Sequence, residues 1–457
     1  MMSLSERPSP AALRLLTREA MRRFSVIPLS LDPSTGALSL AMSDPDDFEL
    51  VSDIQTAVGV PVVPVRAEPA RIDEWIDAFV NGDSAKAAPA RADQRLQTPA
   101  MRLVDEIISE AMHGGVSDIH FEPGEREFIV RFRKDGVLHV ARRLPVRSVP
   151  ETISRVKILA AMDIAERRRP QDGRIHFNDG SGEVDIRVSA LPTDYGQKIV
   201  LRLLDKGAII HELGSLGMLP RHRELAEKEI RKPYGMFLIT GPTGSGKTTT
   251  LYTLLQMIRS PELNVSTVEE PIEYKLSGIT QTAVNAKIGL TFASALRTLL
   301  RQDPDVIMVG EIRDGETAEL AIRAALTGHL VFSTLHTNDA PSAIVRLIDM
   351  GIEPFLVASA VNMVMAQRLV RRVCPKCGGH SADCVHCGGS GFRGRLGIYE
   401  MMPVSENIRE LIHSRAPLSE IRGLARREGM VTLAEDGLEK VRLGWTTNDE
   451  VASEALL

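Results

Sequence analysis

The chain has 457 residues and a formal net charge of −5, with 43% apolar, 25% charged and 4% aromatic residues. One hydrophobic core rarely serves a chain of this length, so we expect two to four domains. The composition is that of a globular protein, and the acidic balance with few aromatic side chains argues against a dedicated nucleic-acid binder.

No segment has the run of about 18–20 apolar residues that a membrane-spanning helix needs. The best candidate, Phe355 to Ala366, is shorter and contains Asn362, so it predicts a buried helix. The N-terminus lacks the apolar segment of a secretory signal. We therefore expect a cytoplasmic chain, in which any membrane role needs a partner.

Residues 1–80 predict a small α+β domain. Apolar residues with helical spacing occur over 11–24, 48–58 and 69–79, and strand-like segments cover 26–29, 38–42 and 60–65. Few large apolar side chains occur over residues 81–98, which predicts a flexible linker.

Residues 99–212 predict a second α+β domain. It begins with a helix over 101–112, followed by a hairpin over 128–140 with Asp135 and Gly136 at the turn. A further helix is expected over 151–162, and two strands over 184–191 and 198–204.

Residues 213–457 predict an α/β domain. Apolar strands over 236–240, 264–268, 305–309 and 330–334 alternate with helical segments, which is typical of a parallel sheet with helices on both faces. A helical part over 404–457 ends the chain.

A phosphate-binding loop follows the first strand of this third domain. The segment reads G-x-x-x-x-G-K-[ST], and its context of strand, glycine loop and helix is the one that makes this motif specific. Backbone N–H groups would surround a phosphate chain, Lys247 would contact the terminal phosphates, and the Thr248 hydroxyl would ligate Mg²⁺. The predicted nucleoside triphosphate site comprises Gly241, Pro242, Thr243, Gly244, Ser245, Gly246, Lys247, Thr248 and Thr249.

Polar residues follow three other predicted strands. Glu311 ends the strand over 305–309 and is placed to orient or deprotonate the attacking water, unless it is only a surface residue of a loop. Glu270 and Glu273 follow another strand and suit Mg²⁺ and its waters, although acidic clusters are usually just solvated. His329 and His336 bracket a third strand and suggest a sensor of the γ-phosphate.

The four cysteines of the chain fall within fourteen residues. Two C-x-x-C knuckles, Cys374 with Cys377 and Cys384 with Cys387, present four thiolates that complete a tetrahedron. Four sulfurs leave no open coordination position, so we expect a structural site. Zn²⁺ is the expected ion, with iron as the minor alternative.

Several motifs together resemble the secretion ATPase superfamily, and more closely the type II secretion and type IV pilus assembly ATPases. Within the third domain these are GPTGSGKTTT at 241–250, EEPIEY at 269–274, LRQDPDVIMVGEIRD at 300–314 and the histidine segment 328–339. Outside it, SDIHFEP at 117–123, RPQDGRI at 169–175 and VDIRVSALPT at 184–193 are similar to the family's second N-terminal domain. Residues 10–80 resemble the first N-terminal domain more loosely.

The resemblance implies a RecA-like P-loop ATPase domain preceded by small α+β N-terminal domains, the second of them PAS-like. It implies a cytoplasmic homo-hexamer, peripheral on the bacterial inner membrane, that binds inner-membrane platform proteins through the cytoplasmic domain of a membrane anchor. Hydrolysis of ATP with Mg²⁺ would drive pseudopilus or pilus assembly. The matched motifs assign Arg187 and Arg202, from the second domain, and Arg297 and Arg301, from the ATPase domain, to the nucleotide. Guanidinium donors suit transition-state charge on phosphoryl oxygens.

The sequence departs from the family pattern at Glu270, where Asp is usual, and at Gln197, where Glu is usual. The long Leu- and Gly-rich signature with which some relatives bind a cyclic dinucleotide is not found, so that ligand is not expected. The tetracysteine element is typical of assembly ATPases, and the short N-terminal region favours type II secretion over pilus assembly. A DNA-translocating ATPase and a non-enzymatic nucleotide-gated scaffold are the rivals from other classes.

Overall fold

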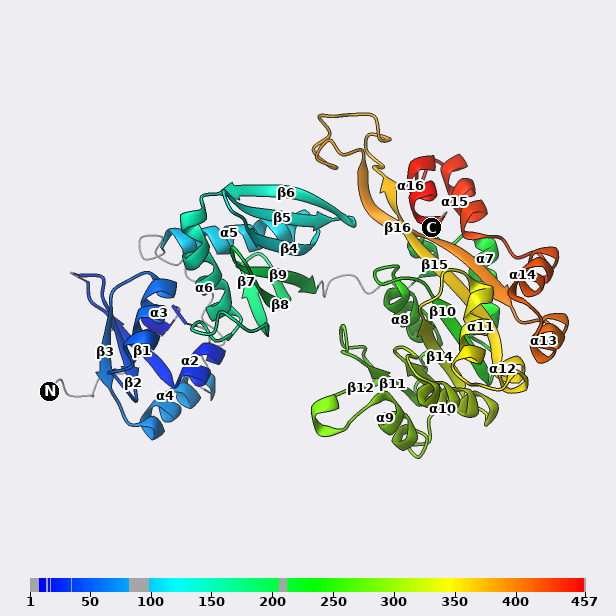
Figure 1. Cartoon of the computed structure of the whole chain (residues 1–457), viewed down its shortest axis with the longest axis horizontal. Helices are drawn as coiled ribbons and strands as arrows, with labels where there is room; N and C mark the ends of the chain where they lie inside the picture. Colours follow the sequence, from blue (N-terminus) through cyan, green and yellow to red (C-terminus); the bar gives the residue numbers. More distant parts are fainter. Residues whose placement is uncertain are drawn as a thin grey trace. The chain divides into compact units, whose positions relative to one another are not determined.

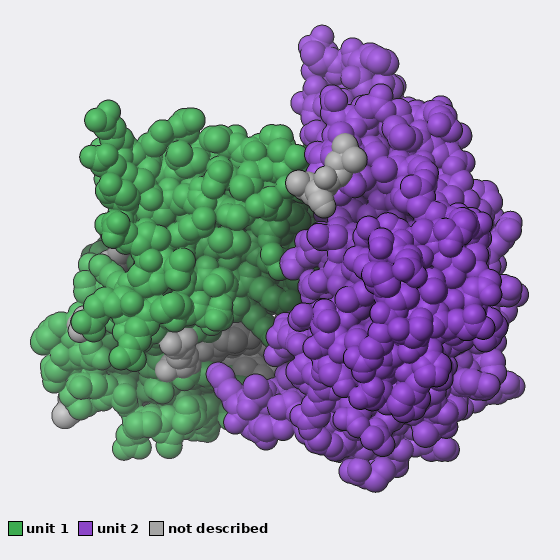
Figure 2. Space-filling model, turned by 45° about the vertical axis from the view of Figure 1, so that its right-hand side comes forward, with its two compact units in different colours: residues 1–207 green, residues 208–457 purple. Residues whose placement is uncertain are grey.

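The computed structural model of the chain contains two compact units, residues 1–207 and 208–457, which are coloured separately in Figure 2. The structure describes residues 8–13, 15–16, 18–33, 35–81, 98–204 and 212–455. Most of the predicted linker, residues 82–97, lies outside these ranges.

A three-stranded sheet with the order β1-β2-β3 opens the first unit (Figure 1). β1 and β2 are antiparallel, whereas β2 and β3 are parallel. The elements are α1 (Pro10–Leu13), α2 (Arg18–Phe24), β1 (Val26–Leu31), β2 (Leu38–Met42), α3 (Phe48–Val58), β3 (Val62–Arg66) and α4 (Pro69–Asn81). The single helix predicted over 11–24 is wrong. The chain forms two short helices with a break between them, and both Leu15 and Leu16 are buried at that break.

The same unit contains a six-stranded antiparallel sheet with the order β6-β5-β4-β9-β8-β7. Its elements are α5 (Pro99–Gly114), β4 (Val116–Pro123), β5 (Phe128–Lys134), β6 (Val137–Leu144), α6 (Val149–Leu159), β7 (Gln171–Asn178), β8 (Glu183–Thr193) and β9 (Gly196–Leu204). Met101 of α5 and Ile158 of α6 pack into the core of the smaller sheet. The two sheets of this unit therefore share buried apolar surface.

A seven-stranded sheet with the order β12-β11-β13-β14-β10-β15-β16 forms the centre of the second unit (Figure 1). All neighbouring strands are parallel except β16, which runs antiparallel to β15. The strands are β10 (Gly235–Thr240), β11 (Val265–Glu269), β12 (Thr280–Ala283), β13 (Val306–Val309), β14 (Leu330–Leu335), β15 (Val361–Val373) and β16 (Phe392–Pro403). The expected parallel α/β sheet is confirmed, with one antiparallel strand added at its edge.

Helices cover both faces of this sheet. Strand β10, which lies between β14 and β15, is buried along its whole length: Met236 and Leu238 belong to one apolar core, and Phe237 and Ile239 to the other. The first core also receives α9 to α15, and the second receives α7 and α8. The helices are α7 (Pro220–Glu229), α8 (Lys247–Ile258), α9 (Phe292–Leu299), α10 (Gly315–Leu326), α11 (Ala340–Asp349), α12 (Pro354–Ala360), α13 (Glu406–His413), α14 (Leu418–Arg427), α15 (Leu433–Arg442) and α16 (Asn448–Ala455).

The predicted buried helix over 355–366 is wrong in its second half. Helix α12 ends at Ala360, and Val361 begins β15, which pairs with β10 on one side and β16 on the other. A short, mostly apolar run suits a buried strand as well as a buried helix, and pairing decides between them. In the part of the chain that the structure describes, no helix is both long and apolar enough to cross a membrane.

A buried ion pair anchors α15 to the sheet. Lys440 and Asp436 are fully buried, and the Lys440 Nζ donates to the carboxylate of Asp436 and to the carbonyl of Gly397 on β16. Asp436 also accepts from the backbone N–H of Tyr399 at 2.9 Å. His222 of α7 lies 3.3 Å from the same carboxylate, yet burial lowers the pKa of this imidazole to about 4 despite the attraction of Asp436.

Candidate functional site

The phosphate-binding loop connects β10 to α8 through backbone conformations that require glycine. Gly241, Gly244 and Gly246 have φ of 152°, 84° and 86°. A Cβ atom on Gly241 would lie 2.5 Å from the carbonyl oxygen of Gln367, and one on Gly246 would lie 2.8 Å from the Gln367 Nε2. The left-handed conformations and the close approach of β15 therefore explain the glycines.

Lys247 begins α8 and is buried beneath this loop. Its ammonium group donates to the carbonyls of Gly241 at 2.7 Å and Pro242 at 3.0 Å. Burial lowers its pKa to about 8; the negative charge of Glu311 opposes this shift, and Arg368 adds to it. The remaining residues of the predicted site surround it: Pro242, Thr243 and Gly244 are exposed, Ser245 is buried, and Thr248 and Thr249 are half-buried.

A carboxylate, an arginine and a histidine lie together beyond the ends of two neighbouring strands. Glu311 follows β13 and accepts from Arg313 at 2.6 Å; its other oxygen lies 3.3 Å from the Nε2 of His336, which follows β14. Burial raises the pKa of Glu311, but the hydrogen bond and charge of Arg313, aided by His336, outweigh it, so the pKa lies below its ordinary value. Because β10, β14 and β13 are parallel neighbours, their carboxyl ends bring this cluster to the side of the sheet where the phosphate-binding loop begins.

Arg313 also forms an ion pair with Glu270 at 3.0 Å. It thus joins two of the carboxylates predicted for the site, although the sequence analysis gave it no role. Its position two residues after Glu311 was the only local signal.

The other acidic positions have different surroundings. Glu269, the first residue of the acidic segment, is buried and accepts hydrogen bonds from the hydroxyls of Tyr252 and Thr267 and from Gln281. Its carboxylate is therefore occupied by protein donors. Glu273 is half-buried, and its backbone N–H lies 3.4 Å from the Tyr252 hydroxyl.

The two histidines predicted as a phosphate sensor are not brought together. His329 precedes β14, lies at the opposite end of the strand from His336, and its Nδ1 contacts the carbonyl of Ala324 at 2.9 Å. A six-residue strand spans about 20 Å. The structure thus places His336 beside Glu311, at the carboxyl end of β14, and His329 at the amino end of the same strand.

The four arginines occupy surface positions in the two units. On the antiparallel pair β8 and β9, Arg187 and Arg202 are cross-strand partners, so their side chains share one face of the sheet. Arg202 donates to Asp118 at 2.9 Å. In the second unit, Arg297 forms an ion pair with Glu316, and Arg301 donates to the carbonyl of Arg297.

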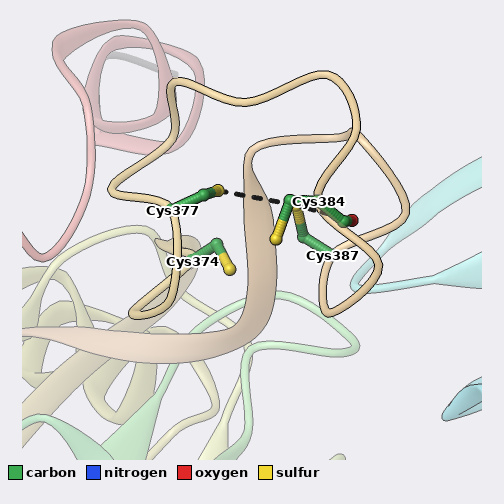
Figure 3. A group of neighbouring side chains, drawn as sticks. All are labelled: Cys374, Cys377, Cys384 and Cys387. Atoms are coloured by element: carbon green, nitrogen blue, oxygen red, sulfur yellow. Dashed lines mark hydrogen bonds between the residues drawn. The ribbon is translucent and has the colours of Figure 1, made fainter.

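The cysteines gather in the loop that joins β15 to β16 (Figure 3). All four Sγ atoms lie within 4.8 Å of one another, and those of Cys377 and Cys387 are 3.8 Å apart. A tetrahedral zinc with Zn–S bonds of about 2.3 Å requires sulfur atoms about 3.8 Å apart. Burial raises the pKa of the Cys377 thiol, but backbone hydrogen bonds from Ser381 and Gly379 outweigh it and lower the pKa to about 6. The donor set therefore fits a tetrathiolate metal centre.

Comparison with known families gives two matches that together cover most of the chain. Residues 93–453 match the family described as "Type II/IV secretion system protein". Residues 3–86 match the "MshEN domain".

Curated relatives come from two kinds of system. The chain is 43% identical to "Type IV pilus assembly ATPase PilB" of Thermus thermophilus, over 98% of this chain and 55% of that protein. It is 41% identical to the protein of the same name from Myxococcus xanthus, over 97% of this chain and 86% of the relative. It is 49% identical to "Type II secretion system protein E" of Pseudomonas aeruginosa, over 82% of this chain and 79% of the relative.

Solved structures of similar fold support the same grouping. The pilus retraction motor PilT with bound ADP is 28% identical, with a TM-score of 0.57, over 77% of this chain and 96% of that one. The ATPase DotB of Legionella pneumophila is 22% identical, with a TM-score of 0.61 over 77% of this chain and 95% of that one, and supports the fold alone. The chain therefore belongs to the type II/IV secretion system protein family, the secretion ATPases.

Proposed function

We propose that this protein is a Mg²⁺-dependent ATP-hydrolysing motor of type II secretion, which drives pseudopilus assembly from the cytoplasmic face of the inner membrane. The observation that carries the enzymatic part is the arrangement at the carboxyl ends of β10, β13 and β14. A glycine loop with a buried lysine lies there, and Glu311, held by Arg313 and His336, lies on the same side of the sheet.

Different residues of the site would bind the phosphates, activate the attacking water and hold Mg²⁺. Backbone N–H groups of residues 243–246 and the N-terminus of α8 would hold the phosphates, and Lys247 would contact the β- and γ-phosphates. Glu311, kept ionised by Arg313, would orient the attacking water and accept its proton. Thr248 and Glu270 would hold Mg²⁺, which supplies charge stabilisation to the phosphoryl oxygens when bound.

Phosphate release by the purified full chain tests this assignment. Lys247→Ala should abolish both nucleotide binding and turnover, whereas Glu311→Gln should retain binding of ATP and lose at least about a hundredfold in kcat. Glu319→Gln is the matched control, because this glutamate is paired with Arg323 on the exposed face of α10. Turnover by Lys247→Ala, or loss of ATP binding by Glu311→Gln, would contradict the proposed roles.

Type IV pilus assembly is the second candidate function. The secretion protein E of Pseudomonas aeruginosa is more identical to this chain, at 49% against 41–43% for the pilus ATPases. The pilus ATPases, however, align with 97–98% of this chain, and the secretion protein aligns with 82%. Deletion of the gene in its own bacterium separates the two: secretion predicts loss of exported proteins with pili retained, and pilus assembly predicts the reverse.

We also propose that the working form is a homo-hexamer docked on an inner-membrane platform protein. The resemblance to the family supports this. The mass of the nucleotide-bound protein in light scattering tests it. A particle that remains monomeric with both nucleotide and the cytoplasmic domain of the anchor would refute it.

A further inference from the structure

Strand β15 lies behind the phosphate-binding loop and contributes side chains that none of the matched nucleotide motifs includes. In the parallel pairing of β10 with β15, Thr240 is opposite Ala366, so Gln367 and Arg368 are level with the first residues of the loop. Both side chains are almost fully buried. Because successive side chains of a strand point to opposite faces, the two residues contact different neighbours of the loop.

Gln367 contacts the side of the loop that leads into α8. Its Oε1 accepts from the hydroxyl of Thr250 at 2.8 Å, and its Nε2 is the atom that a side chain on Gly246 would strike. The amide therefore packs against Gly246 and is hydrogen-bonded to the first turn of α8.

Arg368 lies on the other face of β15 and contacts the segment that follows β14. Its Nη2 donates to the carbonyl of Asn338 at 2.9 Å, and its Nη1 lies 3.1 Å from the position of a Cβ atom on Gly241. The neighbouring Thr337 donates its backbone N–H to the hydroxyl of Thr240 at 2.8 Å. Arg368 thus lies between the start of the phosphate-binding loop and the segment that carries His336, and it is hydrogen-bonded to that segment.

The charge of Arg368 has no direct counter-ion among the residues that the structure describes. The residue is 5% exposed, and its guanidinium donates to the carbonyls of Gln367 and Asn338 and to the amide oxygen of Asn338. Carboxylates of Glu454, Glu400 and Asp339 act on it only from a longer range. Burying an unpaired charge is costly, so such a group is stabilised when an anion comes near.

We propose that Arg368 is a positioning residue of the ATPase site, which holds the loop against the His336 segment and adds a second buried positive charge behind the bound phosphates. This inference rests on the proposed function, since it assigns the triphosphate to the loop. It requires no contact between Arg368 and the nucleotide. The contribution of Arg368 to nucleotide affinity should therefore grow with the number of phosphates. It should also be retained when arginine is replaced by lysine.

The test uses the full-length protein and titrates it with Mg-ATPγS and Mg-ADP. Arg368→Gln should weaken binding of ATPγS by about tenfold or more and of ADP by less, while Arg368→Lys should bind both within about threefold of wild type. In steady-state assays the KM for ATP of Arg368→Gln should rise more than its kcat falls. Arg371→Gln is the matched control, because that arginine lies three residues further along β15 and is paired with Glu450 of α16. It should melt at a lower temperature without selective loss of ATPγS.

Several outcomes would overturn the inference. Binding by Arg368→Gln that stays within twofold of wild type is one, and equal losses of ATPγS and ADP are another. If Arg368→Gln does not fold, Arg368→Lys decides: tenfold weaker ATPγS binding by a folded lysine variant would show that the charge is not what matters. Absence of nucleotide binding by wild type would instead contradict the proposed function itself, so the two failures are distinguishable.

Discussion

The cysteine loop allows a quantitative prediction about metal content and local stability. Replacement of Cys377 by serine removes one of four sulfur ligands that lie within 4.8 Å of one another. The 3.8 Å separation of the Cys377 and Cys387 sulfurs matches the edge of a zinc tetrathiolate, about 3.8 Å. We therefore expect one Zn²⁺ per chain in the wild-type protein and a large loss of metal in the variant.

The expected size of the effect follows from the donor set. Structural zinc sites bind with about 10–16 kcal/mol at neutral pH, which corresponds to dissociation constants from tens of nanomolar to picomolar. Substitution of residues that only hydrogen-bond to metal ligands already lowers metal affinity about 10–100-fold. Loss of a ligand itself should therefore lower the affinity for zinc more than about a hundredfold. β10 pairs with β15 only as far as Ala366, and beyond it the strand pairs with β16 alone. Metal loss should therefore loosen residues 374–391 and the adjoining hairpin and leave the pairing of β10 intact.

Elemental analysis of the purified protein measures the metal, and hydrogen exchange locates the loosening. His380→Ala and His386→Ala are the matched controls, because both histidines are exposed in the same loop and neither belongs to the cluster. Both controls should keep one zinc. Three results would refute the assignment: no metal in the wild-type protein, a full zinc complement in Cys377→Ser, or zinc loss in a histidine variant. One iron per chain would instead show that the site binds iron, the minor alternative.

Three further predictions concern charges described above. Arg313→Gln should move the acidic limb of the ATPase pH profile to higher pH, because this guanidinium lowers the pKa of Glu311; an unchanged limb would contradict the role of Glu311. The pKa of His222 is lowered to about 4, so between that pH and about 6.5 only the unfolded chain binds its proton. Stability should fall by up to about 3 kcal/mol on acidification through this window, and thermal melts of His222→Gln should show a smaller fall; parallel curves would refute this. Lys440→Met should lower the free energy of unfolding in urea by about 3 kcal/mol because Asp436 loses its buried partner, and the double variant with Asp436→Asn should lose less than the sum.

The sequence predicted correctly those strands and turns whose signal lies within the segment itself. The four strands expected in the third domain match β10, β11, β13 and β14 to within one residue at each end. The hairpin of β5 and β6 has its turn at Asp135 and Gly136, as expected. Each of these elements has contiguous apolar residues bounded by glycine, polar or turn residues, so a short window contains the whole signal.

Features that depend on neighbours in space were missed. β15 could not be told from a helix because its first residues, Val361 to Ala366, are apolar apart from Asn362, and only its pairing with β10 and β16 reveals the strand. For the same reason Arg368 had no visible role, since its contacts come from segments far away in sequence. The separation of His329 from His336 could have been foreseen, because the predicted strand between them already places them at opposite edges.

The length of β15 has a mechanical consequence. Gln367 of this thirteen-residue strand lies beside Gly246 of the phosphate-binding loop, and Cys374 follows the last residue of the strand, about 23 Å from Gln367 at the rise of an extended chain. A displacement of β15 at the phosphate-binding loop would therefore reach the cysteine loop through one continuous strand, which β16 pairs along most of its length.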